Sequence, residues 1–153
     1  MERPRAIFDA NLFLNLLLSR DPDDSAVGLL LRFAAEFAFD LLLAQDVEAE
    51  LRDAAMRRPH LASRISEEAL DAQFDRIAAF AVRIPLLEQE PPRISRDARD
   101  DYLIALAVLN AADYVVTRDK DLLDLGEVSG VRMIDPVAFL AMLRARQRAS
   151  DSA

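Results

Sequence analysis

The sequence predicts an α/β fold, a three-layer sandwich in which a central parallel sheet is covered by helices on both faces. Short apolar runs of strand length alternate along the chain with longer helical segments. Each run is apolar throughout, without the in–out alternation of a half-exposed strand, which is typical of parallel strands buried on both faces. The 153 residues fit one domain. We expect it to span residues 1–147, followed by a polar tail over residues 148–153.

The first part of the chain predicts two strands separated by two helices. Arg5–Phe8 is a short apolar strand, and Leu12–Leu18 follows as a helix that is apolar nearly all round. The Asp-Pro-Asp-Asp-Ser sequence at 21–25 combines turn and helix-start residues, so a helix is expected over residues 25–37. The apolar run over residues 39–44 then predicts the second strand.

The middle of the chain predicts two helices and a short strand. Asp46 is a suitable N-cap for a helix through Arg57, which Pro59 closes. Ser66 is a suitable N-cap for a helix reaching Val82, and residues 83–87 form a candidate strand. The stretch over residues 88–96, with two adjacent prolines, has the composition of a loop.

The last part of the chain predicts a helix that Asp100 opens and that runs to about Ala111, then a strand over residues 113–117. A turn-rich segment leads to a strand over residues 131–134. The final helix starts at Asp135-Pro136, because aspartate is a good N-cap and proline suits the first helical position.

The composition excludes several kinds of site. Without cysteine there is no disulfide, thiolate zinc site or cysteine nucleophile, and the chain suits a reducing cytoplasm. The single histidine, His60, which we expect on a loop or surface, rules out mechanisms that need two. Three glycines are too few for a phosphate-binding glycine-rich loop. The apolar run after the N-terminus contains Asp9, Asn11 and Asn15, so no signal peptide or membrane span is readable.

The net charge of −8 argues against a protein that coats nucleic acid, because such binding depends on many Lys and Arg residues that neutralise phosphates. Contact with RNA must therefore be local. Arg93, Arg96 and Arg99 precede Asp100 at a spacing of three, and Arg118 adjoins Asp119, so some of these arginines are candidates for holding substrate phosphates. They equally fit a role of offsetting neighbouring acids on the surface.

Acidic residues follow the predicted strands, where ligands bind in open α/β sheets. Asp9 and Asp119 come just after strands, Glu50 lies early in the helix after the second strand, and Asp100 opens a helix. A helical wheel places Asp100 near the centre of the apolar face of its helix and Asp101 near the edge. Each of these acids also fits a purely structural role as a helix cap, a turn residue or a helix-dipole partner. Periodicity does not distinguish Glu50 from Glu48.

Four acid-bearing segments follow one another along the chain: Ile7-Phe-Asp-Ala-Asn-Leu-Phe13, Val47-Glu-Ala-Glu-Leu51, Asp100-Asp-Tyr-Leu-Ile-Ala-Leu-Ala107 and Val116-Thr-Arg-Asp-Lys-Asp-Leu-Leu123. In this order they resemble the segments of the PIN-domain family, and in particular its toxin ribonucleases. The closing Ile134-Asp-Pro-Val-Ala-Phe139 also resembles the last strand and helix of the family. The matches of the four segments span residues 6–123, and the resemblance implies a sheet between helices.

The resemblance implies a site of four carboxylates that holds Mg²⁺ or Mn²⁺ and cuts RNA, and it favours Glu50 over Glu48. It further implies a homodimer and a cognate antitoxin protein. The catalytic quartet would be Asp9, Glu50, Asp100 and Asp119, with Asp9, Asp100 and Asp119 as metal ligands, and the supporting groups would be Asn11, Thr117, Asp101 and Asp121.

Two other functions fit part of the pattern. A phosphatase with Asp9 as nucleophile would usually carry a second aspartate at position 11, which here is Asn11, and Lys120 is the only lysine it could use. An inactive PIN-like interaction module would keep the acids only as caps or relics. Metal binding and RNA cleavage separate these alternatives from a nuclease.

Overall fold

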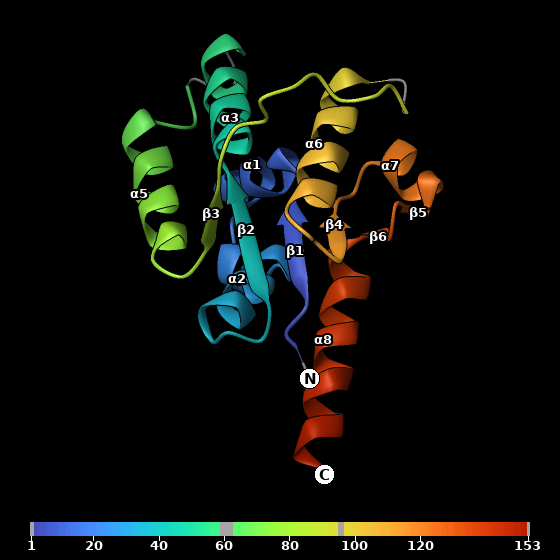
Figure 1. Ribbon diagram of the computed structural model, residues 1–153. Helices are drawn as coiled ribbons and strands as arrows, with labels where there is room; N and C mark the ends of the chain where they lie inside the picture. Colours follow the sequence, from blue (N-terminus) through green and yellow to red (C-terminus); the bar gives the residue numbers. More distant parts are fainter. Residues whose placement is uncertain (1, 59–62, 95–96, 153) are drawn as a thin grey trace.

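The computed structural model describes residues 2–58, 63–94 and 97–152, and within them the chain forms one six-stranded sheet flanked by helices (Figure 1). The strands are β1 (Arg5–Phe8), β2 (Asp40–Ala44), β3 (Val82–Ile84), β4 (Tyr114–Val116), β5 (Glu127–Val128) and β6 (Val131–Ile134). The helices are α1 (Ala10–Leu18), the 3₁₀ turn η1 (Pro22–Asp24), α2 (Ala26–Ala35), α3 (Gln45–Arg57), α5 (Glu67–Ala78), α6 (Ala98–Leu109), α7 (Lys120–Leu125) and α8 (Pro136–Asp151).

The predicted α/β class is confirmed, and the sheet is parallel except at one edge. In the order β3-β2-β1-β4-β6-β5, every pair is parallel except β5 with β6. The segment that its sequence predicted to be rich in turns contains the short helix α7 and the strand β5, neither of which was predicted. Ser129 and Gly130 have φ of 50° and 85°, the two consecutive positive values of a tight hairpin, and a tight hairpin joins antiparallel strands.

The apolar run of β2 is buried from both sides, as predicted, whereas Arg83 of β3 and Arg132 of β6 are exposed. Leu41, Leu42 and Leu43 are consecutive residues of β2, and each is only 1% exposed. Since successive side chains of a strand point to opposite faces, both faces of the sheet are covered. Helix α2 packs against α8, α1 packs against α3, and α6 contacts β4 and β6.

The aromatic side chains of the core join the sheet to α8. The Phe139 ring of α8 packs edge-on against Phe39 with a centroid separation of 5.1 Å, and it lies 5.2 Å from the ring of Tyr114. Phe8 stacks on the other side of Phe39 at 6.0 Å. These contacts lock the last helix onto β1, β4 and the start of β2.

Several predicted element boundaries are wrong. The N-cap of α3 is Ala44, which makes no side-chain capping bond, so Asp46 lies inside the first turn of the helix. Ser66 does cap α5 by accepting from the Ala69 N–H, but that helix ends at Ala78 and Val82 already belongs to β3. The positions of Pro59 and His60 lie outside the described residues.

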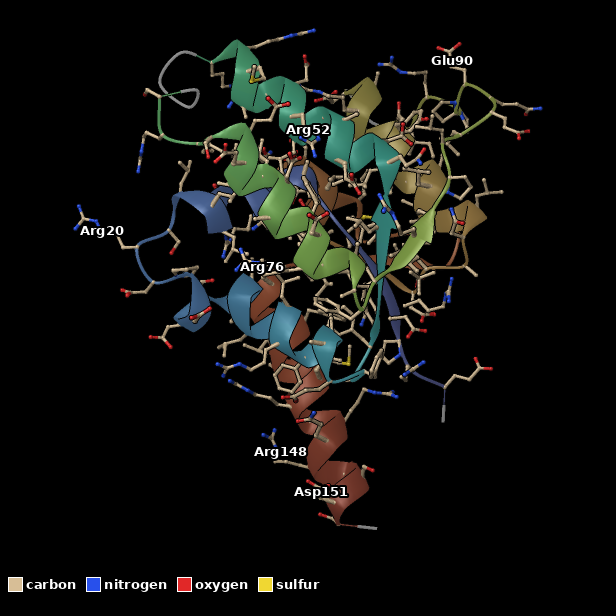
Figure 2. All side chains as sticks on the ribbon, turned by 90° about the vertical axis from the view of Figure 1, so that its left-hand side faces the viewer. Arg20, Arg52, Arg76, Glu90, Arg148 and Asp151 are labelled. Atoms are coloured by element: carbon tan, nitrogen blue, oxygen red, sulfur yellow. The ribbon has the colours of Figure 1, made fainter. Side chains whose placement is uncertain are left out.

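The C-terminal helix is longer than predicted. The polar composition of residues 148–153 predicts a tail, but α8 continues through Asp151. Arg148 and Asp151 lie on the part of α8 that projects beyond the rest of the chain (Figure 2). The sequence over residues 144–149 is rich in alanine, arginine and glutamine, whose high helix propensity carries the helix past the packed core. Among the described residues, no helix is long and apolar enough to cross a bilayer.

The strand order places the expected ligand position between β1 and β4. From β1 the chain first adds β2 and β3 on one side, and it then crosses to add β4 and β6 on the other. Such a reversal opens a crevice at the carboxyl ends of the two central strands, where open α/β sheets bind their ligands. Asp9 follows β1 and Asp119 lies just beyond the end of β4, so both acids stand at this crevice.

Candidate active site

Five acidic side chains from four segments line one small cavity at the carboxyl ends of the central strands. The cavity has a volume of about 110 Å³. Its acidic lining consists of Asp9, Glu50, Asp97, Asp100 and Asp119, and among the described residues two arginines, Arg58 and Arg99, line it with them. The structure thus brings together the four acids that the sequence nominated, and it adds a fifth. The pocket carries a clear excess of negative charge.

Asp9 is both a helix cap and a wall of the cavity. Its Oδ1 accepts from the Asn11 backbone N–H at 3.2 Å, which caps α1. Its Oδ2 accepts from the Thr117 hydroxyl at 2.9 Å. The two roles that the sequence left open are therefore compatible, because the cap turns the carboxylate toward β4. Asn11 is exposed and also lines the cavity.

Thr117 connects the two central strand ends. It is fully buried, it donates to Asp9, and its Oγ1 accepts from the Asp119 backbone N–H at 3.0 Å. Asp119 in turn caps α7 by accepting from the Asp121 N–H at 2.9 Å. One hydroxyl thus sets the relative position of two candidate metal ligands. Asp121 contributes only its backbone to this arrangement, and its side chain is exposed.

The N-terminus of α6 brings two more acids to the cavity. Asp97 is the N-cap, since its Oδ1 accepts from the Arg99 N–H at 2.9 Å, and Asp100 lies in the first turn. Helices α1, α6 and α7 therefore all point their N-termini at the acidic cavity. The partial positive charge of each helix N-terminus stabilises carboxylates placed there.

The structure distinguishes the two glutamates that periodicity did not. Glu50 lines the acidic cavity, whereas Glu48 pairs with Arg83 of β3 at 3.0 Å, away from it. The arginine that pairs with Glu48 comes from strand β3, so the periodicity of the helix could not predict this ion pair.

Burial and mutual repulsion raise the pKa values of three cavity acids. Burial is the main cause of the raised pKa of Asp9, which its hydrogen bonds with Asn11 and Thr117 oppose. Burial and then the charge of Asp9 raise the pKa of Glu50. Burial, followed by the charges of Asp119, Asp97 and Asp9, raises the pKa of Asp100 to about 6. A positive ion would relieve this excess of negative charge.

The raised pKa of Asp100 predicts a loss of stability with rising pH in metal-free buffer. Above the unfolded value of 3.8 the unfolded chain releases this proton, whereas the folded chain keeps it until pH about 6. The folded state is therefore favoured at low pH, and this advantage disappears as the pH rises through 6. We therefore compare the Tm of Asp100→Asn with that of the parent protein in EDTA. We expect the Tm of the variant to rise relative to that of the parent as the pH increases from 4 to 7. A Tm difference independent of pH would contradict the raised pKa.

The arginines that were candidates for phosphate binding differ in position. Arg99 lines the cavity, with its guanidinium 3.8 Å from Glu50 Oε1 and 3.6 Å from Asp97 Oδ1. Arg118 is exposed and does not line the cavity, and Arg96 lies outside the described residues. Arg58, at the end of α3, lines the cavity without having been nominated.

Asp101 does not belong to the acidic cavity, contrary to its grouping with the supporting residues. It is 1% exposed, accepts from the Ile94 N–H at 3.0 Å, and pairs with Arg93 at 3.2 Å. Its carboxylate therefore anchors the loop that precedes α6.

The helical wheel misjudged which side of α6 is covered. Val108 lies on the apolar side of the helical wheel but is 42% exposed, whereas Leu106 is buried. Asp100 is only partly buried, and the adjacent Asp101 is enclosed. The reason is that the preceding loop, through the Ile94 N–H and Arg93, covers the Asp101 side of α6 in addition to the sheet. The buried arc of the helix is therefore not the arc of its apolar residues.

Sequence reasoning missed Asp97 and Arg58 as cavity residues. Asp97 could have been recognised from the sequence, because aspartate is a good N-cap. With Asp97 as the N-cap, the helix begins before Asp100. Arg58 carried none, since its position depends on the packing of α3 against α1.

The donor set of the cavity fits a hard divalent cation. Carboxylate oxygens are the ligands that Mg²⁺ and Mn²⁺ prefer, and the pKa values of Asp9 and Asp100 are raised by burial first and then by neighbouring acids. Within residues 2–58, 63–94 and 97–152, no group of three or more acidic or histidine side chains is already arranged to ligate an ion. Full coordination by the chain would thus require side chains to turn inward, or water molecules to bridge them.

The comparisons with known proteins agree with the fold. A family profile described as "PIN domain" matches residues 5–121. No curated protein matches the chain. A solved structure titled "Crystal structure of PAE2754 from Pyrobaculum aerophilum" is similar, with 16% sequence identity, a TM-score of 0.57 and coverage of 93% of this chain and 90% of that chain. At this identity the likeness concerns the fold alone.

Proposed function

Because the chain belongs to the PIN domain family, whose members are typically nucleases, we propose that it is a divalent-metal-dependent endoribonuclease acting on single-stranded RNA. The observation that carries this proposal is the convergence of Asp9, Glu50, Asp100 and Asp119 on one cavity. Two carboxylates about 4 Å apart repel by roughly 4 kcal/mol at an effective dielectric of 20. An acidic pocket of this kind is therefore suited to a doubly charged ion.

The cavity residues divide into ligands and groups that act on the substrate. Asp9 and Asp100, with Asp119, would hold the ion directly or through water. Glu50 would orient the attacking water and accept its proton, because its raised pKa makes it a better base. The bound ion would acidify that water and stabilise the charge that develops on the phosphodiester. Water adds to phosphorus and the bond to the 3′-oxygen breaks, so the products carry a 5′-phosphate and a 3′-hydroxyl.

The position of Arg99 is suited to holding the substrate phosphate. Its guanidinium lies at the cavity between Glu50 and Asp97, at distances of 3.8 and 3.6 Å that are too long for tight pairing. A guanidinium held loosely by two carboxylates can turn toward a phosphate, which it binds through two parallel hydrogen bonds.

The proposal is tested by incubating the purified chain with end-labelled single-stranded RNA in Mg²⁺, in Mn²⁺ and in EDTA. We expect internal cleavage in both metals, none in EDTA, and products that a 5′-phosphate-dependent exonuclease degrades. Cleavage in EDTA, or cyclic-phosphate products, would rule out this mechanism. Intact RNA in every buffer, together with no binding of Mn²⁺, would favour an inactive interaction module.

An aspartyl-nucleophile phosphatase receives less support from the site. Lys120, the one lysine available to such a mechanism, is exposed and does not line the cavity. Both oxygens of Asp9 are already engaged, one by Asn11 and the other by Thr117. Trapping of a phosphoryl group on Asp9 during turnover would overturn the nuclease assignment.

Replacing Thr117 by valine tests whether its hydroxyl positions the metal ligands. We expect the affinity for Mn²⁺ to fall by about 10- to 100-fold, the usual cost of losing a hydrogen bond that orients a ligand. Valine has nearly the same shape but cannot donate to Asp9 or accept from Asp119. Calorimetric titration with Mn²⁺ measures the loss, and Thr117→Ser should restore most of the affinity. Equal affinity in the valine variant would remove Thr117 from the site.

The cellular role rests on the resemblance to toxin ribonucleases. We propose that the chain is the toxin of a toxin–antitoxin pair, acts as a homodimer in the cytoplasm, and is held inactive by a cognate antitoxin protein. Expression of the chain should then arrest growth, whereas expression of Asp100→Asn should not. Analytical ultracentrifugation should give twice the monomer mass. Normal growth with active enzyme would refute the toxin role but not the nuclease activity.

A further inference from the structure

A second cavity, of about 430 Å³, borders the acidic one and lies between α3 and α6. We call it the α3–α6 cleft. Glu50 and Arg99 line both cavities, so the two are adjacent. Ligand pockets usually have volumes of about 300–1,000 Å³. The cleft is therefore large enough for a substrate group next to the position where the phosphodiester would be cut.

The floor of the cleft is apolar and one wall is aromatic. Val47, Leu103 and Leu106 are buried side chains that line it, and Tyr102 stands beside them. The Tyr102 hydroxyl accepts from the Leu87 N–H at 3.2 Å and lies near the Asp46 carboxylate, whose pKa it influences. The outer end of the ring is thus held in place. Such a rigid ring beside an apolar floor is a stacking platform, and single-stranded RNA is recognised by stacking of its bases on aromatic side chains.

The polar groups of the cleft are mainly hydrogen-bond acceptors. Asp46 lines it near the carboxyl end of β2, and its Oδ2 atom is buried without a hydrogen-bond partner among the described residues. Asp53 stands at the exposed edge. Acids here repel a phosphate but attract an uncharged group that carries N–H donors. A buried acceptor without a donor is costly, so a ligand that supplies one gains affinity.

We propose that the α3–α6 cleft is a nucleobase subsite for the nucleotide next to the scissile phosphate, with a preference for guanine. This inference rests on the proposed nuclease function. Guanine is the base whose Watson–Crick edge presents two adjacent donors, N1–H and the N2 amino group. Its edge matches a carboxylate, which only accepts. Uracil presents one donor between two acceptors, and those acceptors would face Asp46 unfavourably.

Binding of free nucleosides tests the cleft separately from catalysis. Nucleosides carry no phosphate, so they can be titrated into ¹⁵N-labelled protein in EDTA, with amide shifts followed by NMR. We expect guanosine to shift the amides of Ala49, Tyr102 and Leu103 and to bind about tenfold more tightly than uridine, the effect of one hydrogen bond to a charged group. Equal binding of the four nucleosides, or shifts confined to other parts of the chain, would overturn the proposal.

Two variants and one control identify the groups responsible. Asp46→Asn should lose the preference for guanosine, since an amide both donates and accepts, and Tyr102→Phe should keep weak stacking with reduced preference. The control is Asp75→Asn, an exposed acid of α5 outside the cleft, which should bind guanosine like the parent. Unchanged guanosine preference in Asp46→Asn, in a protein with a well-dispersed spectrum, would remove Asp46 from recognition and overturn the proposal.

Mapping of cleavage sites separates the two proposals. RNA cut in Mg²⁺ with guanine enriched at one fixed position beside the cut supports both. Metal-dependent cleavage without any base preference refutes the subsite and leaves the nuclease intact. Guanosine binding in the cleft without RNA cleavage refutes the nuclease. Shifts caused by free arginine, and by no nucleoside, would assign the cleft to a basic peptide and overturn the subsite.

Discussion

Asp100→Asn is expected to lower metal-dependent RNA cleavage by about 1,000-fold while leaving the fold intact. Asp100 lines the acidic cavity without capping a helix, because the N-cap of α6 is Asp97. Asparagine has the same shape, so packing is preserved and only the charge that attracts the cation is removed. RNA cleavage in Mg²⁺ and Mn²⁺ measures the loss, with circular dichroism to verify folding.

The same variant should be at least as stable as the parent when no metal is present. Burial and the charges of Asp119, Asp97 and Asp9 oppose ionisation of Asp100, so removing its charge relieves repulsion in the folded state. This opposite response of activity and stability is typical of a functional residue. The matched control is Asp124→Asn, an exposed acid of α7 that does not line the cavity, which should cleave RNA normally. Full activity in a folded Asp100→Asn protein would exclude Asp100 from the mechanism.

Phe139→Ala is expected to lower the free energy of unfolding by about 3–5 kcal/mol, the usual cost of truncating a buried phenylalanine. Phe139 is 0% exposed and contacts the rings of Phe39 and Tyr114. Its removal leaves a void where α8 meets the sheet, and rings held by the backbone of two strands cannot move far enough to fill it. Urea denaturation followed by circular dichroism measures the change.

The control for Phe139 lies on the same helix. Val137 is 66% exposed, so Val137→Ala should change the free energy of unfolding by less than about 0.5 kcal/mol. A loss below about 1 kcal/mol for Phe139→Ala would mean that α8 contributes little to the core. Since the aromatic cluster also includes Phe8, directly before Asp9, a large loss would link the stability of α8 to the strand that carries the first acid.

Most of the fold was predictable because its signals are local. The strands predicted at Arg5–Phe8 and Val131–Ile134 match the observed strands, and Asp135-Pro136 starts the last helix as predicted. Strand β5 was not predictable, since two residues paired through a tight hairpin have no periodicity of their own. The extension of α8 was underestimated because exposed polar residues are as compatible with a helix as with a tail.

The sequence predicted the acidic residues of the candidate site but not the contacts that surround them. Asp9 and Asp119 follow strands whose ends meet, so parallel topology alone brings them together. The pairing of Glu48 with Arg83, the enclosure of Asp101 by the loop at Arg93, and the approach of Arg58 all depend on contacts between distant segments. No pattern within one helix reports such contacts.

The sequence by itself determined which segments become strands and which acids stand at their ends, because hydrophobic periodicity and capping act over a few neighbouring residues. Only the tertiary structure decided which of two adjacent acids faces a cavity and which anchors a loop, as Asp100 and Asp101 show. The physical reason is that the exposure and charge of a side chain depend on what the rest of the chain places over it.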